Sequence, residues 1–103
     1  MGNKILSLLG FASKAGKLGF GFSKSLEMLG RNKSKLIVTA FDVSQKSKKE
    51  ICFYAEQKNI TVINLENTDI LQLSNSVGHK CGIISVNDEG FAKAIKEEIF
   101  NDQ

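Results

Sequence analysis

The sequence contains no proline, no low-complexity segment, no internal repeat and no long apolar run. Without a proline-rich or repetitive stretch there is no candidate linker, and 103 residues suit one domain with a single core. No apolar run approaches the roughly 20 residues that a membrane-spanning helix needs. Near the start, Ile5, Leu8, Leu9 and Ala12 recur at helical spacing, which favours a docked first helix over a signal peptide. We therefore expect a single cytoplasmic domain over residues 1–103.

Cysteine and histidine are also scarce, being limited to Cys52, Cys81 and His79. No CxxC pair is present and one histidine cannot form a metal site alone, so we expect no metal and no cofactor. Without an export signal, two buried reduced thiols are expected rather than a disulfide. His79 and Cys81 could share one face of a strand as a Cys/His pair. A turn that leads into a strand explains the same two residues.

Acidic residues are scarce in the first half of the chain. Residues 1–49 hold ten basic and two acidic residues, a net charge of +8, whereas residues 50–103 hold four lysines and nine carboxylates, a net charge of −5. A basic half in a small domain indicates a polyanionic partner, and an unevenly charged solvated surface is the alternative.

Helical and extended patterns alternate along the sequence. Extended segments are predicted at residues 17–22, 35–41, 60–65 and 82–86, and helices at residues 3–15, 23–32, 69–77 and after Ser44 and Asp88. The segments KLIVTAF (35–41) and ITVINL (60–65) have the composition of buried strands. The alternation predicts an α/β fold, a three-layer α/β/α sandwich with a mixed sheet of about four strands and helices on both faces.

The expected helices have recognisable starts and apolar faces. Ser44 and Asp88 are residue types that cap helix N-termini. The buried faces are predicted to hold Ile51, Cys52 and Ala55 in the helix after Ser44, and Phe91, Ala92, Ile95 and Ile99 in the last helix. Since capping accounts for Asp88 and its neighbour Glu89, these carboxylates need no catalytic role.

The segment SKAGKLGFGFSKS (13–25) is rich in glycine and lysine. A Walker loop needs GxxxxGK followed by Ser or Thr, but Leu18 follows Gly16-Lys17. A dinucleotide fingerprint GxGxxG fails as well, because Lys24 occupies its third glycine position. We therefore expect neither nucleotide hydrolysis nor dehydrogenase chemistry, and no enzyme.

The same segment suits a nucleic acid that is bound by shape and backbone. Gly19 and Gly21 allow another backbone to approach closely. Ser23 and Lys24 place donors at a helix start, where free amides attract phosphate. Further candidates for phosphate contact are Lys14, Lys17 and Lys35. We expect these lysines to converge on one concave, cationic face at the helix start.

Four segments occur in a familiar order: AGKLGFG (15–21), SKLIVTAFDVS (34–44), LSNSVG (73–78) and GIISVNDEGFAKAI (82–95). Together they resemble the kink-turn RNA-binding superfamily of large-subunit ribosomal proteins, the L7Ae and L30e types. The last two look especially like its small bacterial YlxQ branch. The resemblance covers nearly the whole chain. It implies an α/β/α sandwich and a non-enzymatic protein, associated with the ribosome or translation, that binds sharply bent RNA.

The resemblance also implies roles for individual residues. In the family, a turn reads extruded or mispaired purines, and it corresponds here to Gly21, Phe22, Ser23 and Lys24. A family lysine that lies along the phosphates corresponds to Lys17. A family loop that packs on flipped bases corresponds to Val77, Gly78, His79 and Lys80. Lys35 and Asp42 correspond to residues that flank the central strand.

Three residues of the second helix depart from the family pattern. The ribosomal members open this helix with an Asn-Glu pair and carry a lysine one turn later, whereas Ser23, Lys24 and Glu27 stand here. Two alternatives therefore stay open. One is a protein-interaction module of the same fold with a degraded RNA surface, which docks on a ribosome-associated or translation protein. The other is a substrate-recognition domain of an RNA-modifying enzyme.

Overall fold

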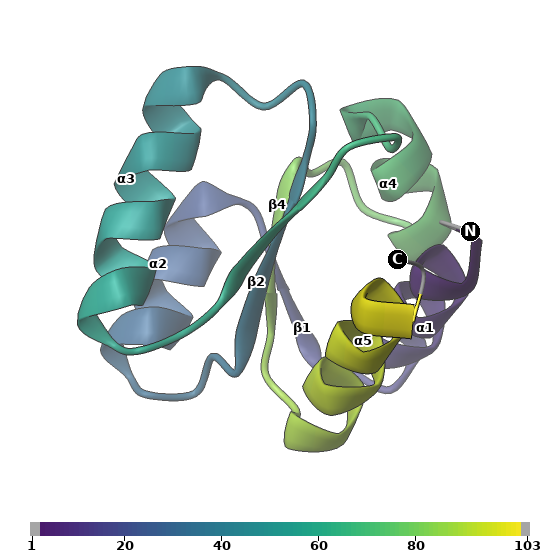
Figure 1. Ribbon diagram of the computed structural model, residues 1–103, viewed down its shortest axis with the longest axis horizontal. Helices are drawn as coiled ribbons and strands as arrows, with labels where there is room; N and C mark the ends of the chain where they lie inside the picture. Colours follow the sequence, from purple (N-terminus) through teal and green to yellow (C-terminus); the bar gives the residue numbers. More distant parts are fainter. Residues whose placement is uncertain (1–2, 102–103) are drawn as a thin grey trace.

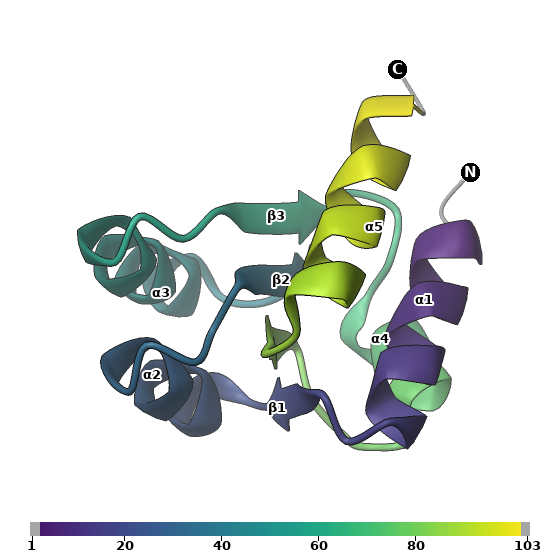
Figure 2. The same ribbon diagram turned by 90° about the horizontal axis from the view of Figure 1, so that it is seen from below.

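The computed structural model describes residues 3–101, where five helices and four strands form three layers (Figure 1). The elements are α1 (Asn3–Lys14), β1 (Leu18–Phe20), α2 (Phe22–Gly30), β2 (Leu36–Ala40), α3 (Gln45–Gln57), β3 (Val62–Leu65), α4 (Ile70–Val77), β4 (Ile83–Val86) and α5 (Glu89–Asn101). Helices α2 and α3 cover one face of the sheet, and α1, α4 and α5 cover the other (Figure 2). The predicted α/β/α sandwich is confirmed.

The four strands form a mixed sheet in the order β1-β4-β2-β3. Strand β4 is antiparallel to both of its neighbours, β1 and β2, whereas β2 and β3 are parallel. Consequently β1, β2 and β3 all end where β4 begins. We call this end of the sheet the carboxyl edge, and the opposite end, where β1, β2 and β3 begin, the amino edge.

Strand β2 is buried along its whole length and supplies both halves of the core. Leu36, Val38 and Ala40 belong to the cluster that includes α1, α4 and α5, whereas Ile37 belongs to the cluster with α2 and α3. This alternation follows from the two-residue period of a strand. Each fully buried leucine or isoleucine contributes roughly 1.5–3 kcal/mol by leaving water.

Two predicted helix starts are confirmed. The Oγ of Ser44 accepts a hydrogen bond from the amide of Ser47 (3.2 Å), and a carboxylate oxygen of Asp88 accepts one from the amide of Phe91 (2.9 Å). The end of the second helix differs from the prediction, because α2 stops at Gly30 and Asn32 takes a left-handed φ of 60°.

Two predictions of burial are wrong. Cys52 is exposed, because it lies about 100° round the helix from its buried neighbour Ile51. The segment 60–65 is not a buried strand: β3 lies at the border of the sheet, Asn64 is exposed and only Leu65 is buried. Cys81 is buried as expected, and both thiols are free. No helix within residues 3–101 combines the length and the hydropathy that crossing a bilayer requires.

Candidate nucleic-acid interface

Helix α2 begins at the carboxyl edge without a side-chain cap. Gly21 precedes it with a φ of 91°, and no side chain bonds to the helix start. The amide of Gly21 donates to the carbonyl of Ile83 (2.7 Å), which fixes the turn against β4. The first intrahelical hydrogen bond is donated by Ser25, so the amides before it are left for a ligand. Such a helix start attracts anions.

The loop between α4 and β4 lies beside this turn. Gly78 ends α4 with a φ of 78°, a left-handed conformation that glycine adopts without strain. The ring of His79 then stacks on the ring of Phe20, the last residue of β1. Ser74 holds the loop from the other side, because its Oγ accepts from the amide of Cys81 and donates to the carbonyl of Cys81. His79 and the next residue, Lys80, are consequently exposed next to the start of α2.

The Cys/His pair that the sequence left open has no support in this geometry. The Sγ of Cys81 faces the backbone carbonyl of His79 at 3.3 Å, whereas the imidazole of His79 stacks on Phe20. Burial raises the pKa of Cys81 to about 11, so the thiol is protonated near neutral pH. Elsewhere in the described part of the chain, no three His, Cys, Asp or Glu side chains gather as metal ligands.

A hollow of about 660 Å³ lies at the same edge, between α4 and the loop that follows it. Its lining includes His79, Lys80 and Leu71, whose side chain is 69% exposed. Asp42 lies on its rim, where a carboxylate oxygen accepts from the amide of Ile70 (2.8 Å). Asp42 therefore caps the start of α4 together with Asp69.

On α2, the carboxylate of Glu27 binds the two neighbouring cations. One of its oxygens lies 3.3 Å from Nζ of Lys24 and 3.2 Å from a guanidinium nitrogen of Arg31. The hydrogen bond from Lys24, with a second from Arg31, holds the pKa of Glu27 below its usual value. Lys24, which was expected to contact phosphate, is thus partly neutralised within its own helix.

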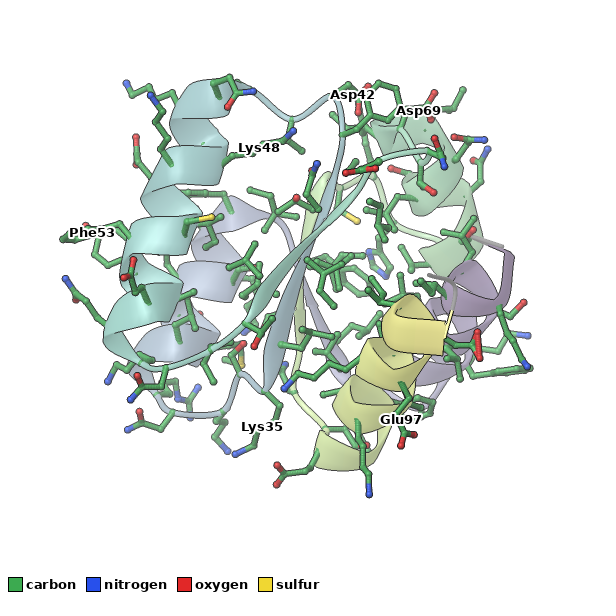
Figure 3. The ribbon with its side chains drawn as sticks, in the orientation of Figure 1. Lys35, Asp42, Lys48, Phe53, Asp69 and Glu97 are labelled. Carbon is green, nitrogen blue, oxygen red and sulfur yellow. The ribbon has the colours of Figure 1, made fainter. Side chains whose placement is uncertain are left out.

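The lysines that were expected to converge lie at opposite ends of the sheet. Gly21, Ser23 and Lys24 follow β1 at the carboxyl edge, whereas Lys17 precedes β1 and Lys35 precedes β2 at the amino edge. Lys14 ends α1 three residues before Lys17. Figure 3 shows the same separation between Lys35 and Asp42. Because β1 and β2 run in the same direction, the backbones of Lys17 and Lys35 lie at the edge opposite to that of Ser23. The side chain of Lys24, however, extends back over Gly19 in the middle of β1, so the single cationic face stays a prediction.

Two further residues that were expected to contact RNA do not reach the surface. Gly19 is buried beneath α2, and a Cβ at this position would lie 3.0 Å from Cγ of Lys24 and 3.3 Å from Cγ of Met28. The close approach that Gly19 permits is therefore that of α2. Val77 is 5% exposed and packs in the core.

Three residues at the carboxyl edge were missed by the sequence reasoning. Phe20 stacks on His79, Phe41 is 46% exposed just after β2, and Nζ of Lys48 donates to the carbonyl of Phe41 (2.6 Å). The sequence signal that could have identified the two aromatic residues is their place relative to the strands. Phe20 ends β1 and Phe41 follows β2, and both strands finish at the carboxyl edge. That signal depends on knowing which strands are parallel.

Comparison with known proteins assigns the chain to a family. It is 27% identical to the RNA-binding protein YlxQ of Enterococcus faecium over 93% of this chain and 91% of that protein. It is also 27% identical to the large ribosomal subunit protein eL30 of Yarrowia lipolytica, over 95% of this chain and 91% of that protein.

Solved structures share the fold. A Bacillus halodurans protein of unknown function superposes with a TM-score of 0.88 at 26% identity, covering 94% of this chain and 97% of that one. The Giardia lamblia 15.5kD RNA binding protein superposes with a TM-score of 0.72 at 15% identity, and the match covers 94% of this chain and 82% of that one. The sequence profile of the ribosomal protein L7Ae/L30e/S12e/Gadd45 family matches residues 3–96, and the chain belongs to that family.

Proposed function

We propose that the chain is a non-enzymatic, cytoplasmic RNA-binding protein that works with the ribosome or another ribonucleoprotein. Its ligand is structured RNA with a sharp, kink-turn-like bend, bound through phosphates and flipped bases. Family membership supports this, as do the names of the Enterococcus faecium and Yarrowia lipolytica relatives, an RNA-binding protein and a ribosomal protein.

The observation that carries the proposal is the uncapped start of α2 beside the loop after α4. We call this region the carboxyl-edge surface, and it consists of Gly21, Phe22, Ser23, Lys24, Gly78, His79 and Lys80. Its free amides suit a phosphate or a base acceptor. The hydroxyl of Ser23 donates or accepts at a base edge, and the stacked rings of Phe20 and His79 offer an aromatic platform for an unstacked base.

The test compares two labelled RNAs of equal length, a hairpin with a kink-turn and an uninterrupted duplex. Lys24→Ala and Lys80→Ala are expected to weaken hairpin binding several-fold and to make its salt dependence shallower by about one unit of log–log slope each. Ser23→Ala is expected to reduce the preference for the hairpin. Lys96→Ala, in the middle of α5, is the control for charge. Unchanged hairpin binding by folded Lys24→Ala and Lys80→Ala would refute the proposed surface.

A second candidate is a protein-interaction module of the same fold. Glu27 favours it, because this carboxylate neutralises part of the charge of Lys24 and Arg31 near the proposed surface. Capture of partners from an extract with and without nuclease separates the two functions. Partners that survive nuclease treatment support the module, and partners lost with the RNA support RNA binding.

A further inference from the structure

Strand β3 leaves one side of the sheet open. Among the described residues β2 is its only neighbour, and Figure 2 shows β3 at the border of the layer of strands. Many proteins protect such a border with a lysine, a proline or a bulge, because its unpaired backbone groups are a template for another strand. The segment ITVINL (60–65) contains no charged residue and no proline. The open side of β3 can therefore accept a further strand.

The pairing of β3 with β2 shows which backbone groups are unpaired. Val62 lies opposite Ile37, and the amide of Ile37 donates to the carbonyl of Thr61 (3.0 Å). Backbone groups alternate in direction along a strand, so Thr61 and every second residue after it bond toward β2. The N–H and C=O groups of Val62 and Asn64 consequently point away from β2. Among the described residues no turn or loop backbone bonds to these outward groups.

A second copy of β3 fits this pattern in one antiparallel register. With Val62 opposite Asn64 of the other copy, every outward N–H and C=O group of the two strands finds a partner. The register that pairs the two Val62 residues would put Asn64 opposite Ile60. The amide of Ile60 already donates to the carbonyl of Ala55 (2.9 Å), so the carbonyl of Asn64 would lack a donor. The first register also brings together the half-buried Ile63 side chains of the two copies, a favourable apolar cross-strand pair.

Helix α3 carries opposite charges beside the same open side. Cys52 and Glu56 line a hollow of about 360 Å³ together with Ile60 and Val62, so this side of α3 borders β3. Lys49 comes three residues before Cys52 and lies on the same side of the helix. Lys49 and Glu56 are both exposed, and neither forms an ion pair with another described residue. This side of α3 therefore has a positive end and a negative end.

Two-fold pairing of the strands would put these charges opposite each other. The axis that relates two antiparallel strands of one sheet is perpendicular to the sheet, so both copies of α3 would lie on the same face and run antiparallel. Lys49 of each copy would then lie toward Glu56 of the other. Such self-complementary charge suits a symmetric interface between identical chains. Phe53, which neighbours Cys52 and is 57% exposed, adds apolar surface.

We infer that the chain forms a two-fold dimer, in which two copies of β3 join the sheets and two copies of α3 lie side by side. Because β3 has only four residues, the dimer is weak. Strand β1 lies at the opposite border of the sheet, so the dimer leaves the start of α2 uncovered in both copies. The inference goes beyond the proposed function and does not depend on RNA binding.

Sedimentation velocity and amide hydrogen exchange test the dimer with the full chain in the absence of RNA. The average mass is expected to rise between about 10 µM and about 1 mM, the range of a weak interface. Over the same range, exchange of the amides of Val62 and Asn64 is expected to slow about threefold or more as their hydrogen bonds form. The amides of Ile63 and Leu65 already bond to β2, so they are expected to exchange slowly at every concentration.

Two results would overturn the inference at this stage. A chain that stays monomeric at the highest concentration would leave the open side of β3 to an extended segment of another protein. A dimer in which the amides of Val62 and Asn64 gain no protection would form through a different surface.

Charge reversal on α3 tests the contact between the helices. Lys49→Glu and Glu56→Lys are each expected to weaken the dimer about three- to tenfold, because each puts like charges opposite each other. The double variant Lys49→Glu/Glu56→Lys restores opposite charges and is expected to associate as the parent does. Lys17→Glu, beside β1 at the other border of the sheet, controls for net charge and is expected to leave dimerisation unchanged. Single reversals without effect, or a double variant as weak as the single ones, would also overturn the inference.

Discussion

The imidazole of His79 lies over the ring of Phe20, with 4.1 Å between the ring centroids and 13° between their planes. Phe20 ends β1 and His79 follows α4, so this contact joins two segments that are 59 residues apart in the sequence. It holds the loop after α4 against the start of α2. Both segments belong to the proposed RNA-binding region.

Replacing His79 separates the effect of the stack from that of the loop. His79→Ala is expected to lower the free energy of unfolding by about 0.5–1.5 kcal/mol, the contribution of an aromatic pair. His79→Phe keeps an aromatic ring over Phe20 and is expected to recover most of this loss. Chemical denaturation measures both variants. Equal stability of His79→Ala and the parent would show that the stack contributes nothing.

Removing the carboxylate of Glu27 is expected to strengthen RNA binding. Glu27→Gln releases Lys24 and Arg31 from their ion pairs and removes a negative charge near the proposed phosphate contacts. Hairpin affinity is expected to rise on the order of two- to fivefold at low salt, and less at high salt. Glu56→Gln, on α3, gives the same change in net charge. An equal gain in both variants would indicate a general charge effect instead.

The same carboxylate predicts a dependence of stability on pH. Because its cations lower the pKa of Glu27 in the folded state, its charged form stabilises the fold above the unfolded pKa, and this contribution is lost as the pH falls through the folded pKa. If the free energy of unfolding of the parent exceeds that of Glu27→Gln, the difference should therefore shrink between about pH 5 and pH 3. An advantage that grows on acidification would contradict the assignment.

Asp42 is expected to contribute to the stability of the fold, by capping α4, more than to the affinity for RNA. Asp42→Ala removes the acceptor for the amide of Ile70 and should cost about 0.5–2 kcal/mol of stability, as the loss of a helix cap does. Asp42→Asn keeps an oxygen acceptor and should cost less. Glu66→Ala, in the loop after β3, controls for the loss of a negative charge. RNA binding that collapses in a stable Asp42→Asn variant would instead indicate direct contact.

The two thiols are expected to differ in reactivity. The pKa of Cys81 is raised to about 11, so at pH 8 roughly one molecule in a thousand carries Cys81 as the reactive thiolate, and this thiol is also buried. Cys52, in contrast, is exposed to the reagent. Iodoacetamide should therefore add one group to the folded protein and a second only in denaturant, as mass spectrometry would show. Cys52→Ser should take up none while folded. Fast alkylation of Cys81 would mean that its segment opens readily.

Gly82 is expected to be indispensable to packing, in contrast to Gly30. A Cβ at Gly82 would lie 2.7 Å from Cγ2 of Val43 and 3.0 Å from Cγ1 of Ile70, so Gly82→Ala should lose about 1–3 kcal/mol. At Gly30, the last residue of α2, a Cβ would meet nothing within 4 Å. Gly30→Ala should thus gain about 0.4–1 kcal/mol. Thermal unfolding of the two variants distinguishes these outcomes.

Periodicity was enough to predict the elements, because each helix and strand buries a regular face. Ser44 and Asp88 marked helix starts through local hydrogen bonds, which depend on neighbours three residues away. Burial of β3 was mispredicted, since the sequence 60–65 does not reveal that the strand has only one partner. The burial of Cys52 was predicted wrongly, because on a helix the residue next to a buried one can point to solvent.

The candidate site was less predictable because it depends on strand direction. Lys17 and Ser23 are six residues apart in the sequence, yet β1 separates them. Ser23 and His79 are far apart in the sequence, yet the antiparallel pairing of β1 with β4 brings their segments to one edge. No local pattern reports this pairing, whereas the family resemblance did group the two segments.

The position of β4 in the sheet also constrains the order of folding. Among the four strands of residues 3–101 it is the last to be synthesised, yet within this sheet β1 pairs with it alone, and it also pairs with β2. Residues 36–65 form a parallel β2–α3–β3 unit from neighbouring parts of the chain, whereas the pairing of Leu18 with Val86 must close a long loop. On the ribosome, β1 must therefore wait for Val86 to emerge from the exit tunnel, so the proposed RNA-binding edge is among the last parts of the domain to assemble.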